Sequence, residues 1–99
     1  MQVVYRLAAG RDVGEARAWY EAEPPGRGLR FQLALETLER LIADHHEAFP
    51  LVGGRVRRAL VARFPYAVYY QPLDADTVEV IACLHTRRRP GAWRRRRDA

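Results

Sequence analysis

The sequence predicts an α+β fold in which two antiparallel helices pack on one mostly antiparallel sheet. Residues 12–44 show helical periodicity in two stretches, interrupted at Pro24-Pro25-Gly26, a combination that ends one helix and makes a tight turn. Three short runs of β-branched, aromatic and aliphatic residues follow. Each is closed by proline or a small acidic turn, as expected for consecutive antiparallel strands. With a short strand at the N-terminus, the expected order is β-α-α-β-β-β, one layer of helices on one sheet.

The N-terminal half supplies the first strand and both helices. Residues 2–7 alternate in the manner of a strand. Asp12 stands three residues before Glu15, the spacing of a capping box, so we expect the first helix to open there. The second helix is expected over residues 28–44, and its apolar face comprises Phe31, Leu35, Leu38 and Ile42. Because the turn between the two helices is short, they should be antiparallel.

The three later strands are expected over residues 56–61, 63–70 and 77–85. Alternation puts Tyr66 and Tyr70 on one face and Tyr69 on the other, with core packing as their expected role. In the last strand, one face carries Val78, Val80, Ala82 and Leu84. The other face carries Glu79, Ile81, Cys83 and His85. Residues 45–54 contain proline and paired glycines and should be irregular.

Length and composition predict one domain over residues 1–99, with a basic tail over residues 90–99. A chain of 99 residues is the size of one small core, and 48% hydrophobic with 29% charged residues is typical of a globular protein. No apolar run approaches the roughly 20 residues of a membrane span, and no secretory signal is evident. Cys83, the single cysteine, excludes an internal disulfide and suits a reducing compartment. We therefore expect a cytoplasmic protein without membrane contact.

Positive charge is concentrated in the second half of the chain. Residues 1–50 carry six arginines against eight acidic residues, whereas residues 51–99 carry eleven against four, and all 17 basic residues are arginine. Arginine offers planar, bidentate donors to carboxylate and phosphate groups. A basic half therefore predicts an anionic partner, either nucleic acid or an acidic protein segment, and composition does not choose between them.

Arginines at the ends of neighbouring strands form the main candidate site. They are Arg57, Arg58, Arg63, Arg87 and Arg88. Gathered on one side of a small sheet, they could hold RNA phosphates or an acidic peptide, or stabilise a phosphoryl-transfer transition state. The plain alternative is a solvated edge that keeps a basic protein soluble. Trp93, directly before the basic run 94–97, is expected to anchor the tail on the sheet.

The histidines do not suggest a metal site, and no cofactor is expected. His45 and His46 are adjacent on a helix and point about 100° apart, and no cysteine or acidic pair stands at a ligand spacing. His85 differs because it ends a strand beside the arginines. It could be an acid or base, or a structural residue that bonds a backbone carbonyl. Cys83 shares its predicted face with Ile81 and is expected to be a packed thiol rather than a nucleophile.

Four features in order resemble the ParE/RelE toxin family of type II toxin–antitoxin modules, also called plasmid stabilisation proteins. They are Trp19-Tyr20, Ala48-Phe49-Pro50, residues 56–60 running into residues 63–70, and residues 85–90 before Trp93. The resemblance covers almost the whole chain and implies the β-α-α-β-β-β fold. It also implies a small cytoplasmic toxin in a hetero-oligomer with a cognate antitoxin, whose acidic C-terminal segment wraps the toxin. The partner- or target-binding residues would be Arg57, Arg58, Arg63, Arg87, Arg88 and Trp93.

The family has two branches, and both remain open at this point. The RelE-like branch cleaves mRNA on the ribosome with basic residues and a tyrosine near the C-terminus; here the catalytic set would be His85, Arg63 and Arg88. The ParE-like branch is described as acting on DNA gyrase and lacks that nuclease set. In this chain Trp93 stands near the expected tyrosine and cannot exchange a proton as a phenol can. No lysine is present, and arginine is a poor general base. The segment over residues 63–66, which joins the first two of the three later strand runs, also resembles the ParE-like branch. A non-enzymatic inhibitor is therefore the favoured interpretation.

Overall fold

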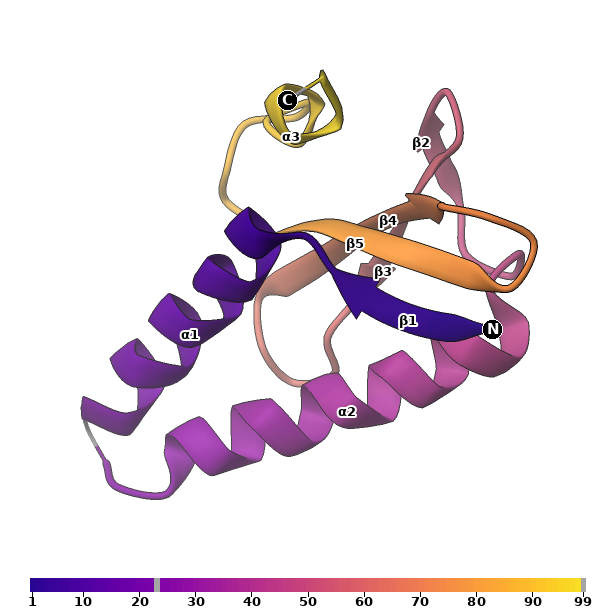
Figure 1. Ribbon diagram of the computed structural model, residues 1–99. Coiled ribbons are helices and arrows are strands. Elements are labelled where there is room, and N and C mark those ends of the chain that lie inside the picture. The colour runs from indigo at the N-terminus through magenta and orange to yellow at the C-terminus, as the bar shows by residue number, and fades with distance from the viewer. Residues whose placement is uncertain (23, 99) are drawn as a thin grey trace.

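The computed structural model describes residues 1–22 and 24–98 and confirms the predicted α+β fold (Figure 1). Its elements are β1 (Gln2–Tyr5), α1 (Leu7–Ala22), α2 (Arg27–His45), β2 (Leu51–Gly53), β3 (Val56–Leu60), β4 (Tyr66–Pro72), β5 (Thr77–His85) and α3 (Arg94–Asp98). The strands form one sheet in the order β1-β5-β4-β3-β2. β1 runs parallel to β5, and the other neighbouring strands are antiparallel. Glu23 and Ala99, both within the predicted domain, lie outside the described residues.

The two long helices agree with the predictions to different degrees. α2 matches the predicted second helix to within one residue at each end. β1 ends at Tyr5, and α1 begins at Leu7, five residues before Asp12, so the predicted helix start is wrong. The Asp12 carboxylate does not cap α1; it accepts the backbone N–H of Cys83 on β5 at 3.0 Å. A local capping rule fails here because a distant strand uses the same carboxylate.

α1 and α2 cover one face of the sheet, and the main core lies between these layers (Figure 1). The four predicted apolar positions of the second helix are all buried in it. The rings of Tyr20 and Phe31 stack with their centroids 5.5 Å apart, and Phe64 meets Tyr20 edge-on at 4.8 Å. Burial of one such ring stabilises the fold by about 1.5–3 kcal/mol. This aromatic cluster therefore holds both helices against the turn between β3 and β4.

A β-bulge in β5 changes which side chains face the helices. Tyr69 pairs with Ala82 and Tyr70 pairs with Val80, so Ile81 has no partner on β4. The extra residue reverses the alternation, and the predicted division of faces is therefore wrong from Ala82 onward. The helix-side core contains Val78, Val80 and Cys83, and the opposite core contains Ile81, Ala82 and Leu84.

A second, smaller core lies on the opposite face of the sheet, beneath the C-terminal segment. Its buried members are Val56, Ile81, Ala82, Leu84 and Trp93. Trp93 is only 3% exposed, which confirms that it anchors the tail on the sheet. Tyr69 packs on the same side, whereas Tyr66 and Tyr70 pack in the helix-side core, as strand alternation predicts.

The segment before β3 is more regular than predicted. Leu51–Gly53 forms β2, a short edge strand that pairs with β3 in an irregular register, where the sequence predicted a loop. Gly53 allows the tail to approach closely, because a Cβ at this position would lie 2.7 Å from the Cη2 atom of Trp93. Glycine inside a strand often marks such a close approach.

We expect Gly53→Ala to lower the free energy of unfolding by about 1–3 kcal/mol, because the added methyl group overlaps the Trp93 ring. Gly14→Ala is the matched control, in the interior of α1, where nothing lies within 4 Å of the added Cβ. It should raise the free energy of unfolding by about 1 kcal/mol through helix propensity. Urea unfolding measures both changes, and an unaltered stability of Gly53→Ala would contradict the packing of Trp93 against β2.

Candidate functional site

The five candidate arginines do not form a single patch. Arg57 and Arg58 are neighbours on β3, so their side chains point to opposite sides of the sheet. Arg57 points to the helix side and donates to the backbone carbonyls of Phe49, at 2.7 Å, and Glu47, at 3.2 Å. Arg57 therefore ties the loop before β2 to the sheet.

The structure does bring Arg58, Arg88 and Trp93 together, on the sheet face opposite α1 and α2. They line a hollow of about 280 Å³ between the C-terminal segment and the strands, which we call the outer hollow. Its polar and aromatic lining comprises Arg58, Tyr69, Thr86, Arg88, Trp93 and Arg94. The lining thus contains three arginines and no carboxylate.

Hydrogen bonding and ring stacking hold the side chains of the outer hollow in place. The Nε–H group of Arg58 donates to the hydroxyl of Tyr69 at 3.1 Å. The Tyr69 ring lies 20° from parallel to the Trp93 ring, with centroids 6.2 Å apart. The Arg94 guanidinium lies 5.1 Å from the centre of the Trp93 ring, a cation–π contact. Arg94 was not predicted as a site residue, and the available signal was its position directly after an anchoring tryptophan.

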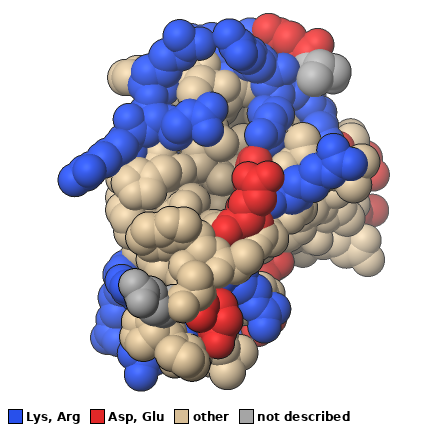
Figure 2. Space-filling model, turned by 90° about the vertical axis from the view of Figure 1, so that its left-hand side faces the viewer, with Lys and Arg blue, Asp and Glu red and all other residues tan. Residues whose placement is uncertain are grey.

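Arg87 lies just outside this hollow, in the turn after β5. Its backbone N–H donates to the Nδ1 atom of His85 at 3.0 Å, and the residue is exposed. In Figure 2 the basic side chains of the C-terminal segment form an arc along the top of the molecule, above a hollowed and mostly uncharged area. Positive charge is therefore concentrated around the tail.

Arg63 lies elsewhere, in the turn between β3 and β4, beside α2. A hollow of about 650 Å³ in that region is lined by Arg63, Phe64, Leu33, Arg27 and Arg30, among others. Arg63 has a φ of 69° and is the one non-glycine residue with a positive φ in the described part of the chain. This conformation costs on the order of 1 kcal/mol or more, so the surrounding turn holds Arg63 in place. Arg27 and Arg30 were missed, because helix periodicity does not reveal which strand turn a helix meets.

His85 lines a third hollow, of about 490 Å³, with Trp19 and Tyr66 among its other lining residues. The His85 and Tyr66 rings meet edge to face, with centroids 5.3 Å apart. Since the Nδ1 atom accepts the backbone N–H of Arg87, the ring proton belongs on Nε2. The three members of the predicted nuclease set therefore line three different hollows, and Arg27 lines both that of Arg63 and that of His85.

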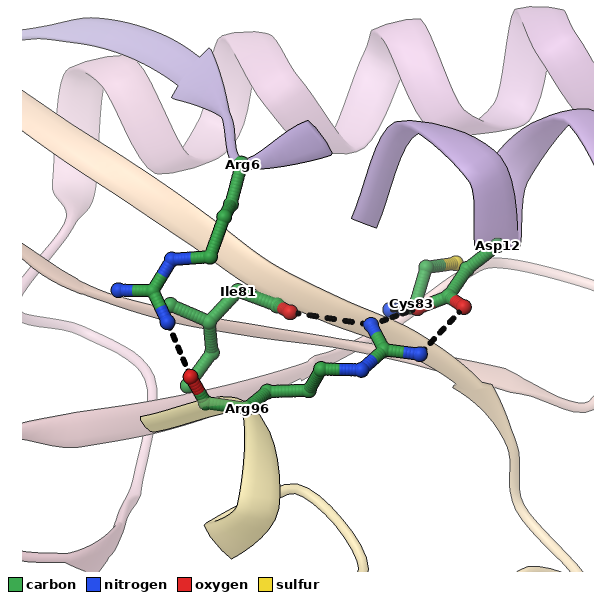
Figure 3. A network of polar contacts seen from close by, with 5 residues as sticks. All are labelled: Arg6, Asp12, Ile81, Cys83 and Arg96. Carbon is green, nitrogen blue, oxygen red and sulfur yellow. Dashed lines mark hydrogen bonds and ion pairs between the residues drawn. The ribbon is translucent and has the colours of Figure 1, made fainter. Parts of the chain in front are cut away.

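One side-chain network fastens the C-terminal segment across the edge of β5 (Figure 3). The Arg96 guanidinium donates to both carboxylate oxygens of Asp12, at 2.7 and 2.8 Å, and to the backbone carbonyl of Ile81 at 3.3 Å. Arg6, in turn, donates to the backbone carbonyl of Arg96. The hydrogen bond to Asp12 is the main reason why the pKa of Arg96 is raised. Bidentate pairing of this kind combines charge with fixed geometry, so it fixes the position of the tail.

Cys83 is a packed thiol, as predicted. It is 2% exposed in the helix-side core, and burial raises its pKa to about 12, which suppresses the nucleophilic thiolate. Within residues 1–22 and 24–98, no cluster of three or more His, Cys, Asp or Glu side chains is placed to hold a metal ion. The helices in these ranges are too short or too polar to cross a membrane.

Fold and surface together define a small, basic α+β protein with a helical hairpin on one sheet face and an arginine-rich tail on the other. A family model described as the ParE toxin of the type II toxin–antitoxin system, parDE, matches residues 3–90. The chain therefore belongs to the ParE toxin family. Its fold is also similar to a solved structure described as a chromosomal ParDE TA system from P. aeruginosa. That likeness has a TM-score of 0.70 at 13% identity and covers 86% of this chain and 95% of that chain. No curated protein matches the chain.

Asp12→Ala should destabilise the fold by about 2–4 kcal/mol, because it removes the acceptor of the Cys83 N–H and the partner of the half-buried Arg96. Asp12→Asn retains an acceptor but not the charge, and it should cost less. A double-mutant cycle with Arg96→Ala, followed by urea unfolding, isolates the pairwise contribution. A coupling energy near zero would contradict a stabilising role for the pair.

At pH 8, burial and the raised pKa keep the Cys83 thiol protonated, so very little of the reactive thiolate is present. Iodoacetamide should therefore modify the native chain at least a hundredfold more slowly than the chain unfolded in guanidinium chloride, where the thiol returns to an ordinary pKa and is exposed. Intact-mass measurement over time gives both rates. Similar rates in the two states would contradict the burial of this thiol.

Proposed function

We propose that this chain, as one domain over residues 1–99, is the cytoplasmic toxin of a ParDE-type pair. In this proposal it arrests growth by binding a protein target, DNA gyrase, without catalysing a reaction. A cognate antitoxin neutralises it in a hetero-oligomer, with the acidic C-terminal segment of the antitoxin lying over arginines of the toxin. Membership of the ParE family supports this proposal.

The separation of the predicted nuclease residues is the observation that carries the non-enzymatic part. General acid–base catalysis needs its group within hydrogen-bond reach of the transferred proton, beside the groups that stabilise the developing charge. His85 lies in an aromatic hollow with its Nδ1 atom already bonded, whereas Arg63 and Arg88 line other hollows. Such a distribution suits contacts with several parts of a large partner better than attack on one phosphodiester bond.

The arrangement of charge supports an acidic antitoxin segment as the partner. Arg58, Arg88 and Arg94 line one hollow without a carboxylate among its lining residues, and the exposed Arg87 lies beside it. Trp93 fixes the position of this group through its burial in the outer core. Complementary charge of this kind increases the association rate and the specificity of an interface.

One observation favours the alternative function, a ribosome-dependent mRNA endonuclease. Tyr69 places a phenol hydroxyl in the outer hollow, hydrogen-bonded to Arg58 and close to two further arginines. A phenol can exchange a proton, unlike the indole of Trp93. In such an enzyme Tyr69 would take the acid–base role, because His85 lines a different hollow.

Induced expression in a bacterial host should stop DNA synthesis before protein synthesis, as measured by parallel pulse labelling with thymidine and methionine. The purified chain should also inhibit supercoiling by gyrase in vitro. Tyr69→Phe and His85→Ala should leave the arrest unchanged, because neither side chain is proposed to take part in chemistry. If protein synthesis stopped first and Tyr69→Phe abolished the arrest, the endonuclease function would be correct.

Reversal of charge beside the outer hollow should weaken antitoxin binding. We expect the double variant Arg87→Glu/Arg88→Glu to reduce affinity for the co-purified antitoxin at least tenfold at about 0.1 M salt, through repulsion of acidic side chains. Arg40→Glu is the matched control, because Arg40 is exposed on α2, on the other side of the sheet. Titration calorimetry gives both affinities, and an equal loss in the control would show that only net charge matters.

A further inference from the structure

The outer hollow has a surplus of hydrogen-bond donors that the fold itself does not use. Arg58 uses only its Nε–H, to bond Tyr69, and the Arg88 and Arg94 guanidinium groups make no hydrogen bond within the described residues. No carboxylate lies in the lining to neutralise the three positive charges. At about 280 Å³, the hollow is at the lower limit of small-molecule sites. It therefore suits one anionic group rather than a whole cofactor.

We propose that the outer hollow holds a backbone phosphate of a nucleic acid strand. A phosphate offers several acceptor oxygens to guanidinium groups, and three arginines, Arg58, Arg88 and Arg94, line this one hollow. Further exposed arginines, Arg87, Arg89 and Arg95, are neighbours of the lining residues in the sequence. Regularly spaced charges along a strand can meet several arginines, whereas a free phosphate ion would use the hollow alone.

The hollow is built from three parts of the chain, and its geometry depends on the docked tail. Arg58 comes from β3 and Arg88 from the turn after β5, whereas Arg94 belongs to the tail. Gly91 allows the chain to turn at this point: its φ is 84°, and a Cβ there would collide with the Arg94 guanidinium. Arg96, which binds Asp12, is a positioning residue for the site and does not itself touch the phosphate.

This inference deepens the proposed function without depending on it. A toxin that binds gyrase would lie beside the DNA on which that enzyme works, and the outer hollow would contact that DNA; this link rests on the proposed function. Binding of a nucleic acid strand to the isolated chain does not. The experiment below contains no gyrase and no antitoxin, so its failure and the failure of the proposed function are separate results.

The test is fluorescence anisotropy of the purified full-length chain with a labelled single-stranded DNA of about 20 nucleotides, over a range of salt concentrations. We expect Arg58→Gln and Arg88→Gln each to weaken binding about fivefold to tenfold. Each should also make the slope of log affinity against log salt shallower, by at most about 0.7, because two arginines of the hollow still meet the phosphate. Arg40→Gln removes the same charge from α2 and should change the affinity less than twofold.

Three results would overturn the proposal. An equal loss of affinity in Arg40→Gln and in the hollow variants would show that binding depends on net charge alone. Displacement of the DNA by equimolar pyrophosphate would assign the hollow to free phosphates. A salt dependence left unchanged in both Arg58→Gln and Arg88→Gln would show that neither arginine meets a phosphate.

The role of the tail is tested in a Trp19→Phe background, where Trp93 is the one remaining tryptophan. We expect Arg96→Gln to shift the Trp93 emission to the red and to weaken DNA binding at least as much as Arg58→Gln. Arg96→Lys, which can still pair with Asp12, should restore part of both signals. An emission shift without loss of DNA affinity would show that the docked tail is not part of the site.

Discussion

The pairing of β5 with β1 ends at Val80. Beyond that residue this edge of β5 has no neighbouring strand among the described residues, and the groups that bind its backbone instead determine the position of the C-terminal tail. After the bulge, the Ile81 carbonyl and the Cys83 N–H need partners, since unpaired backbone groups in a protein interior are costly. Asp12 accepts the N–H, Arg96 donates to the carbonyl, and the two side chains bind each other (Figure 3). Two side chains from opposite ends of the chain therefore take the place of a neighbouring strand.

This edge contact also gives a small protein two cores instead of one. With the tail held at Arg96, the Trp93 ring covers apolar side chains on the sheet face that α1 and α2 leave open. The same docking brings the tail arginines next to Arg58 and creates a positively charged hollow. In a toxin of this size, stability and the proposed recognition of anionic partners thus depend on the same segment. Separate hollows for Arg63 and His85 leave other surfaces free for other contacts.

Local sequence patterns predicted β1, the two long helices and the strands β3, β4 and β5 in their correct order, but not the short edge strand β2. Helical periodicity identified α2 almost to the residue, and strand alternation placed the three tyrosines of β4 correctly. The order of elements followed from the run of helices before strands, because each amphipathic element must find a layer to cover. The position of Trp93 before a basic run correctly indicated an anchored tail. These predictions succeeded because neighbouring residues alone encode them.

The way in which distant segments share backbone groups and charges emerged only in the folded chain. The bulge at Ile81 reversed the faces of β5, and no composition rule marks where a strand takes an extra residue. Asp12 looked like a helix cap because its real partners, Cys83 and Arg96, lie far away in the sequence. Arginines that looked like one cluster were divided among different surfaces, since side-chain direction follows register and turn geometry. Local sequence specifies the elements, whereas long-range hydrogen bonds and packing specify which of their residues meet.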